Sequence, residues 1–172
     1  MLRPKSWLIF ALFCSLPLSI LACAGAPAQA PVLAPTEQAA PEGPGSCEPT
    51  PSDALGPFYK PDAPLRERVG EGYLLNGVVR SSSDCAPIPG AQIEIWMAGP
   101  DGEYADEYRA TLFSDEQGAY RFESHFPPSY SGRPPHHHLR ISAQGYQTLV
   151  TQHYPVEGVN EAVFDLVLVP AP

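Results

Sequence analysis

The chain has 172 residues and a formal net charge of −9 at neutral pH, with 22 prolines, 14 glycines and four cysteines. Because no basic stripe offsets this acidity, nucleic acid is excluded as an expected partner. The sequence contains no glycine-rich phosphate loop, nucleophile elbow or zinc-protease helix motif, so it indicates none of these common sites.

Residues 1–22 have the pattern of an export signal. Arg3 and Lys5 form a basic start, and residues 7–21 form an apolar run too short for a comfortable membrane-spanning helix. The run ends at Ala22-Cys23, which resembles a bacterial lipobox, so we expect lipidation at Cys23 and peripheral attachment to a membrane. Ordinary signal cleavage after Ala30 is the alternative. The predicted location is the cell envelope, as a periplasmic or cell-surface lipoprotein, or otherwise the secreted fraction.

Residues 23–46 are rich in alanine and proline, with little that could pack. This composition predicts a semi-extended, disordered linker before a folded domain at residues 47–172. Cys47 and Cys85 remain in that domain, and an oxidising compartment favours a disulfide between them. Two free buried thiols are the alternative reading.

The domain begins with an irregular arm and continues as short strands. Proline and glycine punctuate residues 50–68, which excludes a long helix or a central strand. Gly77 indicates a bulge or a close approach of another segment. Strands are expected at residues 73–80, 91–96 (half-buried), 109–113, 119–123, 138–142, 147–153 and 162–169. Short strands with turn residues between them predict an all-β fold, an antiparallel β-sandwich.

Three of the five histidines stand together in the stretch Arg133-Pro134-Pro135-His136-His137-His138. Side chains at i and i+2 of a strand share a face, so His136 and His138 can reach one ion while His137 faces away. The spacing alone predicts a metal site and ordinary surface histidines equally well. If His136 and His138 do bind a metal, zinc or copper would also be compatible with them.

Tyr104 and Tyr130 are the other candidate ligands. Packing is the ordinary role of a tyrosine, and its phenol has a pKa of about 10, so it binds as a phenolate only where an ion lowers that pKa strongly. Ferric iron suits a mixture of imidazole and anionic oxygen ligands, whereas zinc or copper would not demand tyrosinates. With His136 and His138, the two tyrosines favour Fe(III) as the cofactor.

Together these motifs resemble the intradiol ring-cleavage dioxygenases, the non-haem ferric enzymes that cleave catechols between their two hydroxyls. The resemblance covers roughly residues 50–169. It is carried, in chain order, by Thr50-Pro51 with Gly56-Pro57-Phe58-Tyr59, Ile93-Glu94-Ile95-Trp96 with Gly102-Glu103-Tyr104, Arg109 with Ser114-Asp115 and Gly118-Ala119-Tyr120-Arg121-Phe122, Pro127-Pro128-Ser129-Tyr130, the histidine stretch, and Leu149-Val150-Thr151-Gln152 with Tyr154.

The resemblance implies roles for particular residues. Tyr104, Tyr130, His136 and His138 would bind Fe(III), and Tyr130 would also act as a general base. Arg133 would stabilise developing negative charge, with Gln152 as a neighbouring polar group. The list of expected catalytic residues is therefore Arg133, Tyr130 and Gln152.

The resemblance also implies a small aromatic diol and O2 as substrates and a muconate-type diacid as product. Two features depart from the family pattern: His137 replaces a bulky apolar residue, and the gap between Tyr130 and Arg133 is short. The alternative function is a non-catalytic or metal-binding β-sandwich module at the cell surface, of a transthyretin-like kind. Whether the chain forms a homo-oligomer is left open by the sequence.

Overall fold

The computed structural model describes residues 47–172. The predicted signal at residues 1–22, the linker at residues 23–46 and the lipidation site at Cys23 lie outside this range. The described elements are β1 (Tyr73–Ser81), β2 (Gln92–Met97), the 3-10 helix η1 (Asp106–Tyr108), β3 (Arg109–Phe113), β4 (Ala119–Ser124), β5 (His137–Ser142), β6 (Leu149–His153), β7 (Glu161–Val163) and β8 (Leu166–Leu168). Within residues 47–172, no helix is long and apolar enough to cross a membrane.

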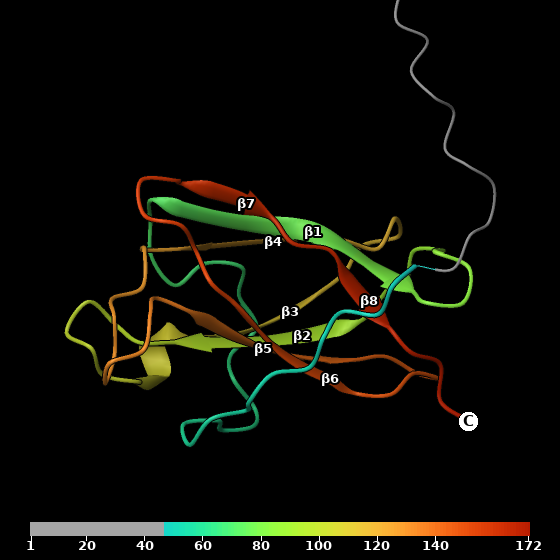
Figure 1. The fold of residues 1–172 in the computed structure, drawn as a ribbon, viewed down its shortest axis with the longest axis horizontal. Coiled ribbons are helices and arrows are strands. Elements are labelled where there is room, and N and C mark those ends of the chain that lie inside the picture. The colour runs from blue at the N-terminus through green and yellow to red at the C-terminus, as the bar shows by residue number, and fades with distance from the viewer. Residues whose placement is uncertain (1–46) are drawn as a thin grey trace, which may run out of the picture. The chain divides into compact units, whose positions relative to one another are not determined.

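The strands form two sheets that face each other (Figure 1). One sheet has the order β4-β1-β7, with β8 also paired to β1, and the other has the order β3-β2-β5-β6. Side chains of β1 alternate between buried and half-buried, as expected for a strand with one face in a core. The core between the sheets includes Leu75, Val79, Ile93, Ile95, Phe122, Leu139, Ile141, Leu166 and Leu168. The predicted all-β sandwich is therefore confirmed.

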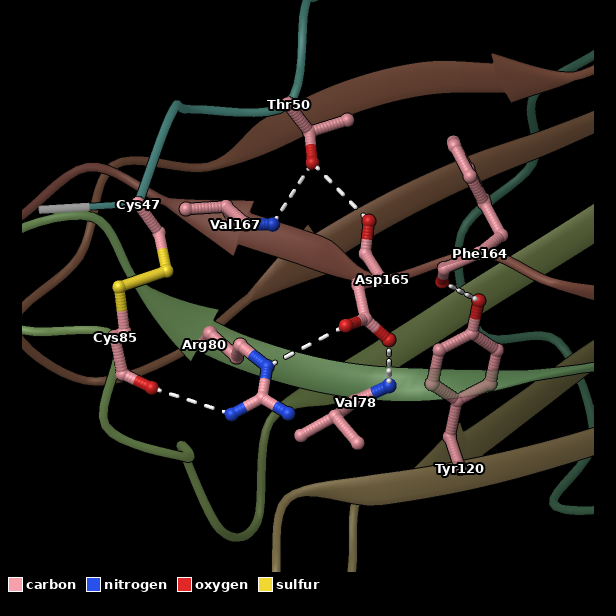
Figure 2. Close-up of polar contacts among 9 residues, drawn as sticks. All are labelled: Cys47, Thr50, Val78, Arg80, Cys85, Tyr120, Phe164, Asp165 and Val167. Atoms are coloured by element: carbon pink, nitrogen blue, oxygen red, sulfur yellow. Dashed lines mark hydrogen bonds and ion pairs between the residues drawn. A yellow bond between two sulfur atoms is a disulfide. The ribbon is translucent and has the colours of Figure 1, made fainter. Parts of the chain in front are cut away.

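The last predicted strand, residues 162–169, is instead two short strands, β7 and β8. Both run parallel to β1, whereas the other strand pairs are antiparallel. At the break, the side chain of Asp165 takes the place of a backbone acceptor, because its Oδ1 accepts a hydrogen bond from Val78 N at 2.8 Å (Figure 2). The carbonyl of Phe164 lies so close to Gly77 that a Cβ there would collide with it, which confirms the expected close approach.

The arm packs along the sheet β3-β2-β5-β6 and covers its outer face. Asp53 N donates to Val150 O at 2.9 Å, and Arg66 N donates to Thr111 O at 3.0 Å. Under the arm, Glu94 is only 4% exposed, and its carboxylate accepts hydrogen bonds from Arg140 at 2.6 Å and from Tyr59. Strand β2 is therefore buried on both faces, and the expectation of a half-buried strand was wrong, because the arm replaces solvent on the outer face.

A disulfide between Cys47 and Cys85, with a Cα–Cα distance of 5.2 Å, joins the start of the arm to the loop between β1 and β2 (Figure 2). Thr50 follows directly and is tied to β8, because its N donates to Val167 O and its Oγ1 accepts from Val167 N at 2.8 Å. These contacts fix the first residues of the arm, which then runs toward the histidines of β5.

Candidate metal centre

Two histidines converge at the start of β5. His136 immediately precedes the strand and His138 lies within it, and their Nε2 atoms are 3.2 Å apart. His138 pairs with Trp96 across the β2–β5 ladder, and the two rings stack with centroids 5.0 Å apart. Strand alternation therefore places both histidines on the face of the sheet that the arm covers.

His137 points the other way, into the core. It is 0% exposed, its Nε2 lies 3.0 Å from Ser124 Oγ, and its ring stacks on Tyr73 at 5.5 Å. Among residues 47–172, no group of three or more His, Cys, Asp or Glu side chains is arranged to hold a metal. The three consecutive histidines therefore do not form a site by themselves, and His137 does not compete with its neighbours for one ion.

Tyr104 brings a third donor atom to the two imidazoles. Its hydroxyl oxygen lies 3.1 Å from His136 Nε2 and 3.4 Å from His138 Nε2. The loop that carries Tyr104 is held by Arg109, which donates to Tyr104 O at 3.1 Å. Phe58 of the arm stacks on the phenol ring, with centroids 4.3 Å apart. The arm and β3 thus fix the tyrosine against the histidines.

Tyr130 lines the same pocket. Its ring meets Tyr104 edge-on at 5.4 Å, and its backbone exchanges two hydrogen bonds with Arg133. The short gap between these two residues is a tight turn, with positive φ at Ser131 and Gly132. The pocket has a volume of about 280 Å³ and is lined by Pro57, Phe58, Tyr104, Tyr130, Ser131, Arg133, His136 and His138.

The protonation states of the imidazoles suit metal binding. His136 Nδ1 lies 2.7 Å from Pro134 O, and since a carbonyl only accepts, Nδ1 carries the proton and Nε2 keeps its lone pair. Burial lowers the pKa of His136 and lowers the pKa of His138 to about 4, so both rings are neutral at pH 7.

Burial raises the pKa of Tyr104, so its phenol ionises only if a cation lies close to it. Two neutral imidazoles, one adjacent phenol and a second phenol that lines the same pocket form a nitrogen and oxygen donor set that fits a hard, highly charged ion such as ferric iron. The residues therefore fit the group that the resemblance implies.

Arg133 and Gln152 are also brought together at this site. Arg133 NH2 donates to Gln152 Oε1 at 2.7 Å, and Gln152 Nε2 donates to Ala54 O in the arm at 2.6 Å. The same NH2 donates to the hydroxyl of Tyr154, which donates to Asp53 at 2.8 Å. Sequence reasoning gave no role to Tyr154 or Asp53, because nothing in a pattern links residues 101 positions apart.

No protein-family model matches the chain. Catechol 1,2-dioxygenase of Candida albicans is 30% identical in an alignment of 146 positions, and the alignment covers 63% of this chain and 48% of the relative. An intradiol ring-cleavage dioxygenase of Aspergillus niger is 29% identical in an alignment of 144 positions, which covers 62% of this chain and 45% of the relative. This chain is a homologue of the intradiol dioxygenases. The predicted resemblance is thereby confirmed, although the chain spans only about half the length of these curated relatives.

A solved dioxygenase structure shares the fold. The dioxygenase domain of a dioxygenase–carbohydrate-binding fusion protein from Streptomyces sp. SirexAA-E superposes with a TM-score of 0.65 at 26% identity. The superposition covers 72% of this chain and 100% of that domain. The sandwich of this intradiol homologue, with its arm, is therefore comparable in extent to a dioxygenase domain of known structure.

Proposed function

We propose that this chain is a non-haem Fe(III) intradiol dioxygenase that cleaves a catechol-type ring between its hydroxyls with O2 to give a muconate-type diacid. The observation that carries the proposal is the convergence of Tyr104 Oη, His136 Nε2 and His138 Nε2 within 3.1–3.4 Å of one another. The homology to catechol dioxygenases supports the same reaction class.

His136, His138, Tyr104 and Tyr130 would hold the iron. When bound, ferric iron supplies Lewis-acid activation of the diol for reaction with O2. The two imidazoles are kept neutral by burial and need not lose a proton to bind. The Tyr104 hydroxyl lies within 3.4 Å of both imidazoles, whereas Tyr130 contacts the ring of Tyr104 edge-on.

The remaining pocket residues have separate tasks. Phe58 and Pro57 give an apolar wall, and a volume of about 280 Å³ suits a single substituted aromatic ring. Oη of Tyr130 is the proposed acceptor for one substrate hydroxyl proton, because this ring lines the pocket beside Tyr104. Arg133 brings a permanent positive charge to the pocket, where it stabilises the negative charge that develops on the ring.

Ferric loading tests the metal centre directly. The loaded protein should show a broad visible absorption band from tyrosinate-to-iron charge transfer, and catechol should shift this band. Tyr130→Phe should change both the band and the turnover. A protein that stays colourless and iron-free after loading would instead fit the alternative of a non-catalytic, transthyretin-like module.

We also propose an exported, lipid-anchored location. The disulfide between Cys47 and Cys85 supports an oxidising compartment. Metabolic labelling with a fatty acid should modify the wild-type chain and fail in Cys23→Ser. Label that persists in Cys23→Ser would exclude this cysteine as the attachment point and favour ordinary signal cleavage.

A further inference from the structure

The guanidinium of Arg133 is held by one amino group only. Its NH2 donates to Gln152 Oε1 at 2.7 Å and to Tyr154 Oη at 3.0 Å. Within residues 47–172, no other side-chain nitrogen of Arg133 has a hydrogen bond, although the residue lines the pocket. Its remaining N–H groups are therefore available to a substrate, and their direction depends on how firmly NH2 is held.

The directions of the hydrogen bonds make Tyr154 an acceptor for Arg133. The Tyr154 hydroxyl has one proton, and its nearer acceptor is Asp53 Oδ2 at 2.8 Å, with Gln152 Oε1 at 3.1 Å. When the proton points to the Asp53 carboxylate, the oxygen lone pairs of Tyr154 face Arg133. A bond to a charged acceptor also polarises the hydroxyl, which makes its oxygen a better acceptor for the guanidinium.

Asp53 is itself fixed by the arm. Its backbone N donates to Val150 O in β6 at 2.9 Å, and its Oδ1 accepts from Ala54 N at 2.6 Å. The second carboxylate oxygen is then directed at Tyr154, which follows the end of β6. The chain of contacts therefore runs from the arm, through Tyr154, to the arginine at the pocket.

We propose that Tyr154, oriented by Asp53, is a positioning residue that aims the Arg133 guanidinium at the anionic substrate. This role rests on the proposed dioxygenase function, and it concerns two residues that need not touch the substrate. Gln152 supplies the other anchor of NH2, so loss of Tyr154 leaves Arg133 in place but free to turn. Since Tyr154 is 41% exposed, Tyr154→Phe removes the hydroxyl without opening the core.

A double-mutant cycle tests the coupling in the iron-loaded, full-length chain. Tyr154→Phe should lower kcat/KM for catechol and weaken catechol binding by about 10-fold each, and Asp53→Asn should do the same to a smaller extent. In an Arg133→Ala background, Tyr154→Phe should change neither quantity by more than about 2-fold, because the residue acts only through Arg133. Tyr146→Phe is the matched control, since Tyr146 precedes β6 while Tyr154 follows it.

The second readout does not require turnover. Side-chain nitrogen NMR of the full-length chain, metal-free and loaded with diamagnetic gallium(III), should give sharp Arg133 N–H signals in wild type and Tyr146→Phe. The same signals should be averaged by rotation in Tyr154→Phe. Unchanged Arg133 signals in Tyr154→Phe, or kinetic effects that simply add to those of Arg133→Ala, would overturn the positioning role. A wild-type chain without turnover would refute the dioxygenase proposal alone, and the NMR comparison would still decide whether Tyr154 orients Arg133.

Discussion

Gly56 of the arm lies against the imidazole of His138, and a Cβ at Gly56 would stand 2.9 Å from His138 Cε1. Gly56 also has φ of +73°, in the left-handed region that favours glycine. Trp96 stacks on the face of the same imidazole at an interplanar angle of 4°. The ring orientation of this candidate ligand is therefore set from two directions, by the arm and by β2.

Gly56→Ala should damage metal binding more than stability. The positive φ should cost about 1–2 kcal/mol of the free energy of unfolding. Because the added methyl group must displace the His138 ring, ferric affinity should fall by about 10-fold or more. Gly90→Ala is the matched control, with φ of +67° and no atom within 4 Å of the new Cβ. Equal iron affinity in both variants would show that the contact with His138 does not matter.

His137→Ala should affect mainly the stability of the fold, whereas His138→Ala should affect mainly the iron content. Truncation of the fully buried His137 should lower the free energy of unfolding by about 2–4 kcal/mol and leave the iron content per folded chain unchanged. His138→Ala should remove iron while the fold persists. Urea unfolding and metal analysis of the two purified variants measure both quantities, and iron loss in folded His137→Ala would place that residue in the centre after all.

The metal-free protein should lose stability as the pH falls from about 6.5 to about 4. Burial lowers the pKa of His153 to about 4, and Tyr73, whose own pKa is raised by burial, can donate its proton to His153 Nε2 at 2.6 Å. In this interval the unfolded chain binds a proton at His153 and the folded chain does not, so the free energy of unfolding decreases on acidification.

Urea unfolding across this pH interval measures the effect. His153→Gln keeps a hydrogen-bond acceptor for Tyr73 but cannot titrate, so its unfolding free energy should vary less with pH than that of wild type. A variant with the same pH slope as wild type would assign the proton uptake to other groups.

Loss of the disulfide should destabilise the sandwich. Cys47 and Cys85 are 38 residues apart, and the chain-entropy model gives about 4 kcal/mol for closing such a loop. The double variant Cys47→Ser/Cys85→Ser should therefore unfold at a lower urea concentration, as should the reduced wild-type protein. An unchanged midpoint in both would mean that the contacts of Thr50 hold the arm without help from the disulfide.

Local periodicity predicted much of the fold and part of the site. Alternation along one strand was sufficient to separate His136 and His138 from His137, and Gly77 correctly marked a close approach. The break in the last predicted strand was missed, because Asp165 replaces a backbone partner with its side chain, and an apolar run carries no sign of that.

Tertiary contacts between residues far apart in the chain could not be predicted from the sequence. The arm was expected to be irregular, but its position over β2, which buries Glu94 with Arg140, depends on the assembled sheet. The link from Asp53 to Tyr154 likewise forms only when the arm meets the end of β6. Such contacts are set by packing, so they become visible only in the folded molecule.

The central claim is that this chain cleaves a catechol between its hydroxyls through the centre formed around Tyr104, His136 and His138. The most direct test is mass spectrometry of the product formed from catechol and isotopically heavy O2 by the iron-loaded chain. We predict a ring-opened muconate-type diacid that carries both heavy oxygen atoms, and no such product with His138→Ala. Unreacted catechol, or a product that contains only one heavy atom, would contradict the account.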